Sequence, residues 1–239
     1  VESYTYAPYQ QRVEATRAYV LETLKWTAAH SREVIELARD ADLRTNMKGE
    51  LMDEPDDLVA LRSREAAWPQ KATILGYEEE TADGRSRSTG KPAEYSVDLM
   101  DRFEPTLSVK RPLLYVIPTD PALDAIVAKL EQHGVRIDTL GFDKTYEIEE
   151  YTITSATSAS REFQGHVLVK CEVQTTTGKR EFPKGTRIVR TAQGLGTLAT
   201  LMLEPQSEDS LATWNYFDAW MKPGSKYPVL RVMRKKGGP

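Results

Sequence analysis

Residues 187–220 constrain the fold more than any other part of the chain, because a strand-like RIVRT passes there into an apolar segment. In QGLGTLATLML, Leu195, Leu198 and Met202 fall at i, i+3 and i+7. This spacing places one apolar stripe on a short helix. Pro205 is expected to end that helix, because proline lacks the backbone N–H that a helix interior needs.

A second short helix is predicted after the polar break EPQSEDS. Ser207 and Ser210 are its candidate N-caps, since a serine hydroxyl can accept a free backbone N–H of the first turn. Its apolar residues again have helical spacing, and they are Leu211, Trp214 and Phe217. We expect the two helices to lie together in the hydrophobic core, with the surrounding strands packed against them.

The composition is that of a globular chain without strong attraction for nucleic acid. It has 239 residues, 40% of them hydrophobic, and a net charge of -4, with basic residues alternating with acidic ones. We therefore expect one or two domains, no nucleic-acid partner and no general attraction to membranes. No apolar run approaches the roughly 20 residues that span a bilayer, so no membrane span is expected. The opening VESYTYAPY does not have the pattern of a signal peptide.

The N-terminal quarter predicts one long helix. Between Pro8 and Asp40 there is no Gly or Pro, and apolar residues recur in steps of three or four. The result is an amphipathic helix with a moderate apolar face, lined by Val13, Val20, Leu24, Ile35 and Ala38. Residues 42–70 are mixed and acidic, with a short helix expected at LVALRSREAAW. Residues 84–92, GRSRSTGKP, are expected to form an exposed loop between the strands ATILGYEEE and AEYSVDLM.

The remainder predicts a mixed region that is mostly sheet. A buried strand at LLYVIP precedes a helix that Asp120 caps, Pro121 opens and Gly134 ends, and VRIDTL forms the next strand. These elements would form a crossover unit, right-handed if its strands are parallel. Further strands are expected at TYEIEEYTITSAT, HVLVKCEVQTT, GTRIVRT and YPVLRVM. TTTGKREFPKG, between the second and third of these, has the residues typical of a turn.

The predicted fold class is therefore α/β, in the α+β sense. A long N-terminal amphipathic helix is followed by a mixed, mostly β C-terminal domain with short helices. We divide the chain into residues 1–70, with the long helix, and residues 71–239, a β-rich accessory domain. A basic cluster near the C-terminus is interpreted as a solvated tail, and it comprises Arg231, Arg234, Lys235 and Lys236.

Cys171 is the only cysteine, which excludes an intrachain disulfide and a cysteine-rich zinc site. It lies in HVLVKCEV, where it shares one face of a strand with Val167, Val169 and Val173. We interpret it as buried apolar filler and not as a nucleophile.

The most suggestive local motif is HSRE, residues 30–33. A histidine followed three residues later by a glutamate can supply two zinc ligands, and zinc carboxypeptidases carry a similar HSRE or HARE motif. Here His30 and Glu33 lie inside a helical pattern, and neither His133 nor His166 has the context of a third ligand. We therefore favour an ordinary exposed helical histidine over a metal ligand.

A broader resemblance extends over nearly the whole chain. VESYTYAPYQQRVEATRAYV resembles the junction of a strand, a Tyr/Pro turn and a long helix in a bacterial branch of the zinc carboxypeptidases, the carboxypeptidase A-like metallopeptidase family. The segments LLYVIPTD, FQGH, LMLEPQSEDSLATWNYFD and YPVLRV are similar to the C-terminal extension of that branch. By this resemblance, residues 1–70 would end a catalytic domain and the rest would be its extension.

The resemblance places Glu2 at the position of the general base that activates zinc-bound water for attack on a peptide carbonyl. The zinc ligands would lie upstream of Val1, so this chain alone is expected to hold no zinc and to be inactive. Its expected partners are an upstream peptidase domain and, in the intact protein, a peptide substrate. Export to the periplasm or the cell exterior is also implied. For Glu2, the alternative is a terminal carboxylate without a role.

A second hypothesis is a non-catalytic binding or structural module that contacts a peptide or glycan through aromatic residues. The candidate lining residues are His166, Trp214, Tyr216, Phe217 and Trp220, although we favour a core position for the aromatic ones, with Trp220 partly exposed. Residues 204–209 carry three carboxylates without the spacing of a calcium loop and are interpreted as a solvated turn. An uncovered apolar face on the N-terminal helix would favour the fragment over the module.

Overall fold

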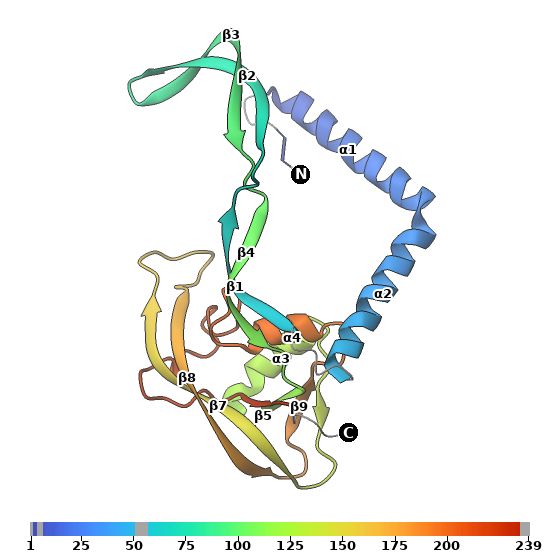
Figure 1. Cartoon of the computed structure of the whole chain (residues 1–239), viewed down its shortest axis with the longest axis vertical. Coiled ribbons are helices and arrows are strands. Elements are labelled where there is room, and N and C mark those ends of the chain that lie inside the picture. The colour runs from blue at the N-terminus through green and yellow to red at the C-terminus, as the bar shows by residue number, and fades with distance from the viewer. Residues whose placement is uncertain (1, 4–6, 51–56, 235–239) are drawn as a thin grey trace.

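The computed structural model describes residues 2–3, 7–50 and 57–234, and it consists of a body with two projecting arms (Figure 1). The body is built on a six-stranded sheet in the order β6-β9-β5-β10-β7-β8, in which every paired neighbour is antiparallel. Its strands are β5 (Leu114–Ile117), β6 (Asp138–Thr139), β7 (Lys144–Ser158), β8 (Val169–Phe182), β9 (Arg187–Arg190) and β10 (Leu230–Val232). The predicted fold class, α+β and mostly sheet, is confirmed.

The sheet has apolar side chains on both faces because its central strands alternate. Tyr115 and Ile117 belong to the larger core cluster, whereas Leu114 and Val116 belong to a smaller cluster on the opposite face. The larger cluster also contains residues of both body helices and of the loop that follows them. The predicted strand at LLYVIP is therefore confirmed, and it is buried on both faces.

The crossover after β5 forms largely as the sequence predicts. Asp120 accepts a hydrogen bond from the Ala122 backbone N–H (2.9 Å) and caps η1 (Pro121–Leu123), which leads into α3 (Asp124–Gln132). Gly134 follows with a φ of +80°, the left-handed conformation that glycine adopts most easily. β6 and β5 both run antiparallel to β9, which lies between them, so they are parallel to each other. β6 has only two residues, fewer than the predicted strand VRIDTL.

The apolar segment predicted as a helix forms α4 (Gly196–Leu203). Its side chains join the larger core cluster, and Ala199 and Leu203 are buried. Gly196 is required at its first turn, because a Cβ there would lie 1.9 Å from the Thr191 carbonyl oxygen. α4 therefore approaches the end of β9 more closely than any residue with a side chain permits.

The second predicted helix is wrong as a regular helix. Residues 211–217 form consecutive turns, followed by η2 (Asp218–Trp220). Ser210 does act as a local cap, since its Oγ accepts the Thr213 backbone N–H at 3.0 Å. Asn215 then takes a φ of +70°, which a right-handed helix cannot contain. The apolar spacing reflects burial of Leu211 and Phe217 and not a helical backbone.

The first arm consists of α1 (Tyr9–Ala29) and α2 (Ser31–Glu50). The region is helical as predicted, but it is divided at His30 and extends beyond Asp40 to Glu50. No side chain of α1 is buried among the described residues, and Val20 and Leu24 are 48% and 60% exposed. No helix among the described residues is long and apolar enough to cross a membrane. The apolar face of α1 thus has no cover in the described part of the chain.

The second arm is a long β ribbon. Its lower half pairs β1 (Leu58–Ala66) with β4 (Arg102–Lys110), and its upper half pairs β2 (Lys71–Ala82) with β3 (Arg85–Asp98). The short helix predicted at LVALRSREAAW is wrong, because Val59 and Leu61 are buried at the two-residue period of a strand. The loop predicted at residues 84–92 is also wrong.

The tip of this ribbon explains why that loop is absent. The hairpin turns at Asp83 and Gly84, which have φ values of +53° and +71°. Two positive φ values are those of a type I′ turn, the connection that an Asp-Gly pair favours. Residues 85–92 therefore continue as strand β3 immediately after the turn.

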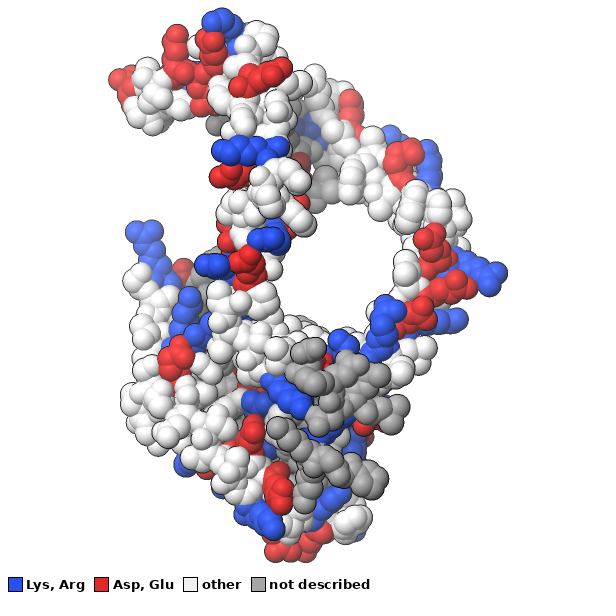
Figure 2. Space-filling model, viewed as in Figure 1, with Lys and Arg blue, Asp and Glu red and all other residues white. Residues whose placement is uncertain are grey.

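Both arms join the body through close packing, at Gly49 against Ala192 and at the buried Val59 and Leu61, and through polar contacts. Arg62 of β1 donates to the Cys171 carbonyl (2.8 Å) and to Glu172 (2.7 Å) on β8. Arg234 donates to the backbone of Lys48 and Gly49 at the end of α2. Figure 2 shows that the two arms and the body surround an opening. The division predicted at residue 70 stays a prediction.

The uncovered helix α1 leads to a testable expectation about local stability. Most helical stability in proteins comes from tertiary packing of an apolar face, and α1 buries no side chain among the described residues. In hydrogen–deuterium exchange by mass spectrometry, we expect the amides of α1 to exchange at least about tenfold faster than those of α4. α4 serves as the internal control. Equal protection of both helices in the monomer would contradict the expectation.

Candidate functional site

Glu2 lies beside the uncovered face of α1. Ser3 holds the adjacent backbone to this helix, because its Oγ donates to the Arg12 carbonyl (3.1 Å) and shares a hydrogen bond with Thr16 Oγ1 (2.7 Å). Glu2 itself is exposed and lines an open groove of about 720 Å³. The groove residues on α1 include Val13, Val20 and Leu21, together with Tyr9, Arg12, Thr16 and Arg17. The catalytic role of Glu2 stays a prediction.

The HSRE motif forms a helix junction. His30 stacks on Trp26, with ring centroids 4.2 Å apart, and its Nδ1 donates to the Trp26 carbonyl at 2.8 Å. His30 ends α1, and Glu33 lies exposed in the first turn of α2. Within residues 2–3, 7–50 and 57–234, no three His, Cys, Asp or Glu side chains are close enough to hold a metal ion. His30 differs from the expected exposed helical histidine, since it is half-buried at a helix end.

The most unusual charge in the body is Glu204, which directly follows α4. Its side chain is buried and 1% exposed. The hydroxyls of Tyr115 and Tyr151 donate to its two carboxylate oxygens at 2.8 and 2.9 Å. The Arg231 guanidinium lies 3.4 Å from the same carboxylate. We call these four residues the Glu204 cluster.

Burial and hydrogen bonding oppose each other in this cluster. Burial raises the pKa of Glu204, while the positive charge of Arg231 and the two tyrosine hydroxyls lower it. Burial likewise raises the pKa of Tyr115 and Tyr151, which keeps both hydroxyls protonated as donors. The nearby carboxylate of Glu204 keeps Arg231 charged and raises its pKa against the effect of burial. The four residues therefore form a buried, hydrogen-bonded structural cluster and not an accessible acid–base centre.

Two predictions about acidic and basic groups are corrected by this geometry. Residues 204–209 are not a solvated turn throughout, because Glu204 points into the core. Glu208 accepts from the Ser63 backbone and Asp209 from the Trp214 indole, so the three carboxylates have separate partners. Arg231 is not part of a solvated tail, because it is buried in β10, while Arg234 is half-buried. Lys235 and Lys236 lie outside the described residues.

Cys171 is buried as predicted. Burial raises the pKa of its thiol to about 11, and its Sγ donates to the Pro205 carbonyl at 3.2 Å. A thiol with such a raised pKa is protonated at neutral pH and is a poor nucleophile. The interpretation as apolar filler is confirmed.

Of the aromatic residues predicted to lie in the core, some do lie there and others line a pocket. Phe217 is fully buried, as expected, and Trp220 is partly exposed, also as expected. Trp214, Tyr216 and His166 instead line a pocket of about 330 Å³. Sequence reasoning missed Lys129 and Asp209 as further residues of this pocket. It also missed the two tyrosines of the Glu204 cluster, although a glutamate directly between an apolar helix and Pro205 is an available signal.

Comparisons with known proteins find similarity to fungal proteins named carboxypeptidase 2. The chain is 32% identical over 129 residues to carboxypeptidase 2 of Trichophyton rubrum, a match of 54% of this chain and 23% of the relative. It is 31% identical over 126 residues to carboxypeptidase 2 of Trichophyton equinum, and 31% over 108 residues to a probable carboxypeptidase 2 of Arthroderma benhamiae. The matches cover 53% and 45% of this chain and 23% and 20% of those relatives.

The chain spans less than a quarter of the length of these curated relatives. No protein-family model matches it, and no solved structure is significantly similar to it. A relationship to carboxypeptidases is thus supported for about half of the chain.

The hydroxyl donors of the Glu204 cluster can be tested with a matched pair of substitutions. Tyr151→Phe removes the hydroxyl that donates to Glu204 and accepts from the Arg231 guanidinium. We expect it to lower the free energy of unfolding by at least roughly 1.5–3 kcal/mol. Tyr146→Phe is the control, because Tyr146 lies on the same strand, is also buried, and has no side-chain hydrogen bond among the described residues. Its effect should stay below about 0.5 kcal/mol. Urea unfolding measures both.

The difference in unfolding free energy between wild type and Tyr151→Phe should also depend on pH. The Tyr151 hydroxyl lowers the pKa of folded Glu204, so its removal raises that pKa further above the unfolded value. A folded carboxyl with a raised pKa loses stability as pH rises through the interval between the two values. Between the unfolded pKa and the folded pKa of the wild type, both proteins lose stability equally. The difference between wild type and Tyr151→Phe should therefore grow only as pH rises above the folded pKa of wild-type Glu204. A constant or shrinking difference would contradict the assignment.

Proposed function

We propose that this chain is the C-terminal portion of a carboxypeptidase-like protein that hydrolyses peptide bonds when intact. The similarity to the fungal carboxypeptidases carries this proposal. The whole protein would act on a peptide substrate. Its export to the periplasm or the cell exterior, and its place in a bacterial zinc-dependent branch, are part of the same proposal.

The upstream partner of this chain would be a peptidase domain that packs on α1. The support for this step is the uncovered apolar face of α1, where Val13, Val20 and Leu21 line an open groove. Apolar groups gain about 25 cal/mol for each Å² removed from water, so covering this face stabilises the helix. The groove also contains Glu2, so a domain that docks there would contact the proposed catalytic residue.

In the proposed reaction, Glu2 is the general base. Its carboxylate takes a proton from the attacking water, the hydroxide adds to the peptide carbonyl, and the same proton is then passed to the leaving amine. Glu2 is exposed and is held near α1 through Ser3.

Zinc does not fit the described residues as a bound cofactor. A zinc site needs at least three protein ligands, and no such group occurs in the described part of the chain. We therefore assign no zinc ligand to this chain and derive no step through the metal. In the proposal, the ligands belong to the upstream domain, and the chain alone is inactive.

The test uses the longer protein that contains both an upstream domain and this chain. We expect Glu2→Gln to lower kcat for a peptide substrate by about 10²–10⁴-fold, with little change in KM, because only proton transfer is lost. Glu14→Gln is the matched control. Glu14 lies on the same helix, is exposed and has only a local contact, a hydrogen bond from Gln10 at 2.8 Å. Wild-type kcat in Glu2→Gln would exclude Glu2 as the base.

A further inference from the structure

The pocket around Trp214 combines an apolar floor with charged and polar side chains, which are Lys129, Asp209, His133 and His166. Its floor is formed by Met202 and Leu211, which are buried, and by Leu198 of α4. Its volume of about 330 Å³ is at the lower end of the range for small-molecule sites, which is about 300–1,000 Å³. The space is therefore sized for a ligand with a single apolar side chain.

One side of the pocket presents a cation. Lys129 extends from α3, and its Nζ lies 5.7 Å from the centre of the Tyr216 ring. None of the carboxylates in the described part of the chain forms an ion pair with Lys129. An ammonium group over an aromatic ring at the edge of an apolar space is complementary to a ligand carboxylate.

The pocket also presents hydrogen-bond acceptors next to Trp214. The Trp214 indole N–H donates to Asp209, whose remaining acceptor positions are available to the pocket. The His166 ring meets the Trp214 ring edge-on, with centroids 5.3 Å apart. Asp209 and Lys129 line the same pocket but form no ion pair with each other, so a space separates their charges.

The hydrogen bonds of Asn215 fix the tautomer of His166. The Asn215 amide nitrogen donates to the Val167 carbonyl (2.9 Å) and to Asp218 (3.2 Å), so its amide oxygen faces His166 Nδ1 at 3.2 Å. His166 Nδ1 must therefore donate the proton in that contact. In the neutral ring, Nε2 then carries a lone pair and is an acceptor. His166 and Asp209 are both suited to receive a ligand ammonium group.

We propose that this pocket binds a free α-amino acid with a branched or aromatic apolar side chain. The ligand carboxylate pairs with Lys129, its ammonium group with Asp209 and His166, and its side chain covers the floor and the Trp214 ring. A multiply charged anion fits less well, because one lysine is opposed by the Asp209 carboxylate. The inference goes beyond the proposed function and does not depend on it.

The binding experiment uses the full 239-residue chain and four probes. Isothermal titration calorimetry is run with L-leucine, L-phenylalanine, N-acetyl-L-phenylalanine and L-phenylalaninamide. We expect saturable binding of the two amino acids with a Kd below about 1 mM. The acetylated probe lacks the ammonium charge and the amide lacks the carboxylate, so each should bind at least about tenfold more weakly than phenylalanine.

Two substitutions separate the two charged contacts. Lys129→Gln should weaken phenylalanine binding by about tenfold or more and leave the weak binding of phenylalaninamide unchanged. Asp209→Asn keeps an acceptor for the Trp214 indole but removes the charge. It should weaken phenylalanine binding and leave N-acetyl-L-phenylalanine binding unchanged.

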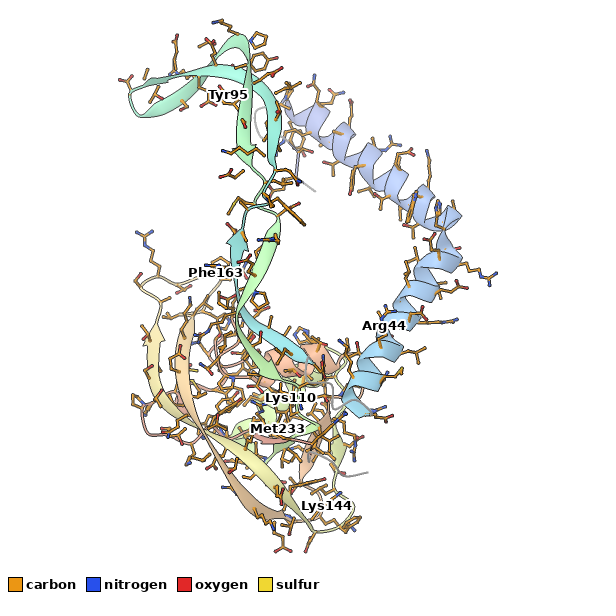
Figure 3. The ribbon with its side chains drawn as sticks, in the orientation of Figure 1. Arg44, Tyr95, Lys110, Lys144, Phe163 and Met233 are labelled. Atoms are coloured by element: carbon orange, nitrogen blue, oxygen red, sulfur yellow. The ribbon has the colours of Figure 1, made fainter. Side chains whose placement is uncertain are left out.

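Lys144→Gln is the matched control, because Lys144 also lies over a tyrosine ring, 5.0 Å from the centre of Tyr146. Figure 3 shows Lys144 at the opposite end of the β7–β8 hairpin from Phe163, whose ring lies 6.3 Å from that of Trp214. Its removal should leave binding unchanged. The substituted residues are at the surface or its edge, and urea unfolding checks that each variant is folded.

Three outcomes would overturn the proposal. They are no saturable binding of either amino acid, equal binding of all phenylalanine probes, and identical effects of Lys129→Gln and Lys144→Gln. Equal binding of the probes would mean apolar recognition only, as expected for a peptide or glycan surface. The titration requires no peptidase activity, so its failure leaves the carboxypeptidase proposal standing, and the reverse also holds.

Discussion

The buried carboxylate of Glu204 is the interaction on which the body depends. An ion removed from water loses several kcal/mol of solvation free energy unless other groups replace its hydrogen bonds. Here the replacements come from three adjacent strands, since Tyr115 is on β5, Arg231 on β10 and Tyr151 on β7. A slip of one residue in any of these strands would turn its side chain to the other face of the sheet. The cluster thus specifies strand register as well as the position of α4.

Elements with a local signal could be predicted from the sequence. The Asp120 cap, Pro121 and Gly134 mark the start and end of the α3 region, and the apolar spacing of residues 195–202 marks α4. Two of the failures occurred where a residue's backbone conformation decides the structure, whereas the helix predicted at LVALRSREAAW failed because β1 pairs with the distant strand β4. The positive φ at Asn215 replaces a helix with turns, and the positive φ values at Asp83 and Gly84 make a tight hairpin where a loop was predicted.

The candidate sites were harder to predict because their residues are distant in sequence. The two tyrosines that bind Glu204 are 89 and 53 residues away from it. Lys129 meets Tyr216 only because α3 and the loop after α4 both pack into the larger core cluster. Aromatic residues spaced as in 214–220 could be recognised as important, but which of them face a pocket depends on these long-range contacts. Phe217 and Trp214 are three residues apart, yet one is buried in the core and the other is at a pocket wall.

The body and the arms differ in how they are stabilised. The body has apolar clusters on both faces of its sheet, whereas α1 buries no side chain among the described residues. Ser3 nevertheless ties the segment that carries Glu2 to α1 through two hydrogen bonds. Any motion of α1 therefore moves Glu2 with it. A general base must be held within hydrogen-bond reach of the proton it abstracts, so the proposed role of Glu2 requires a surface that covers and fixes α1.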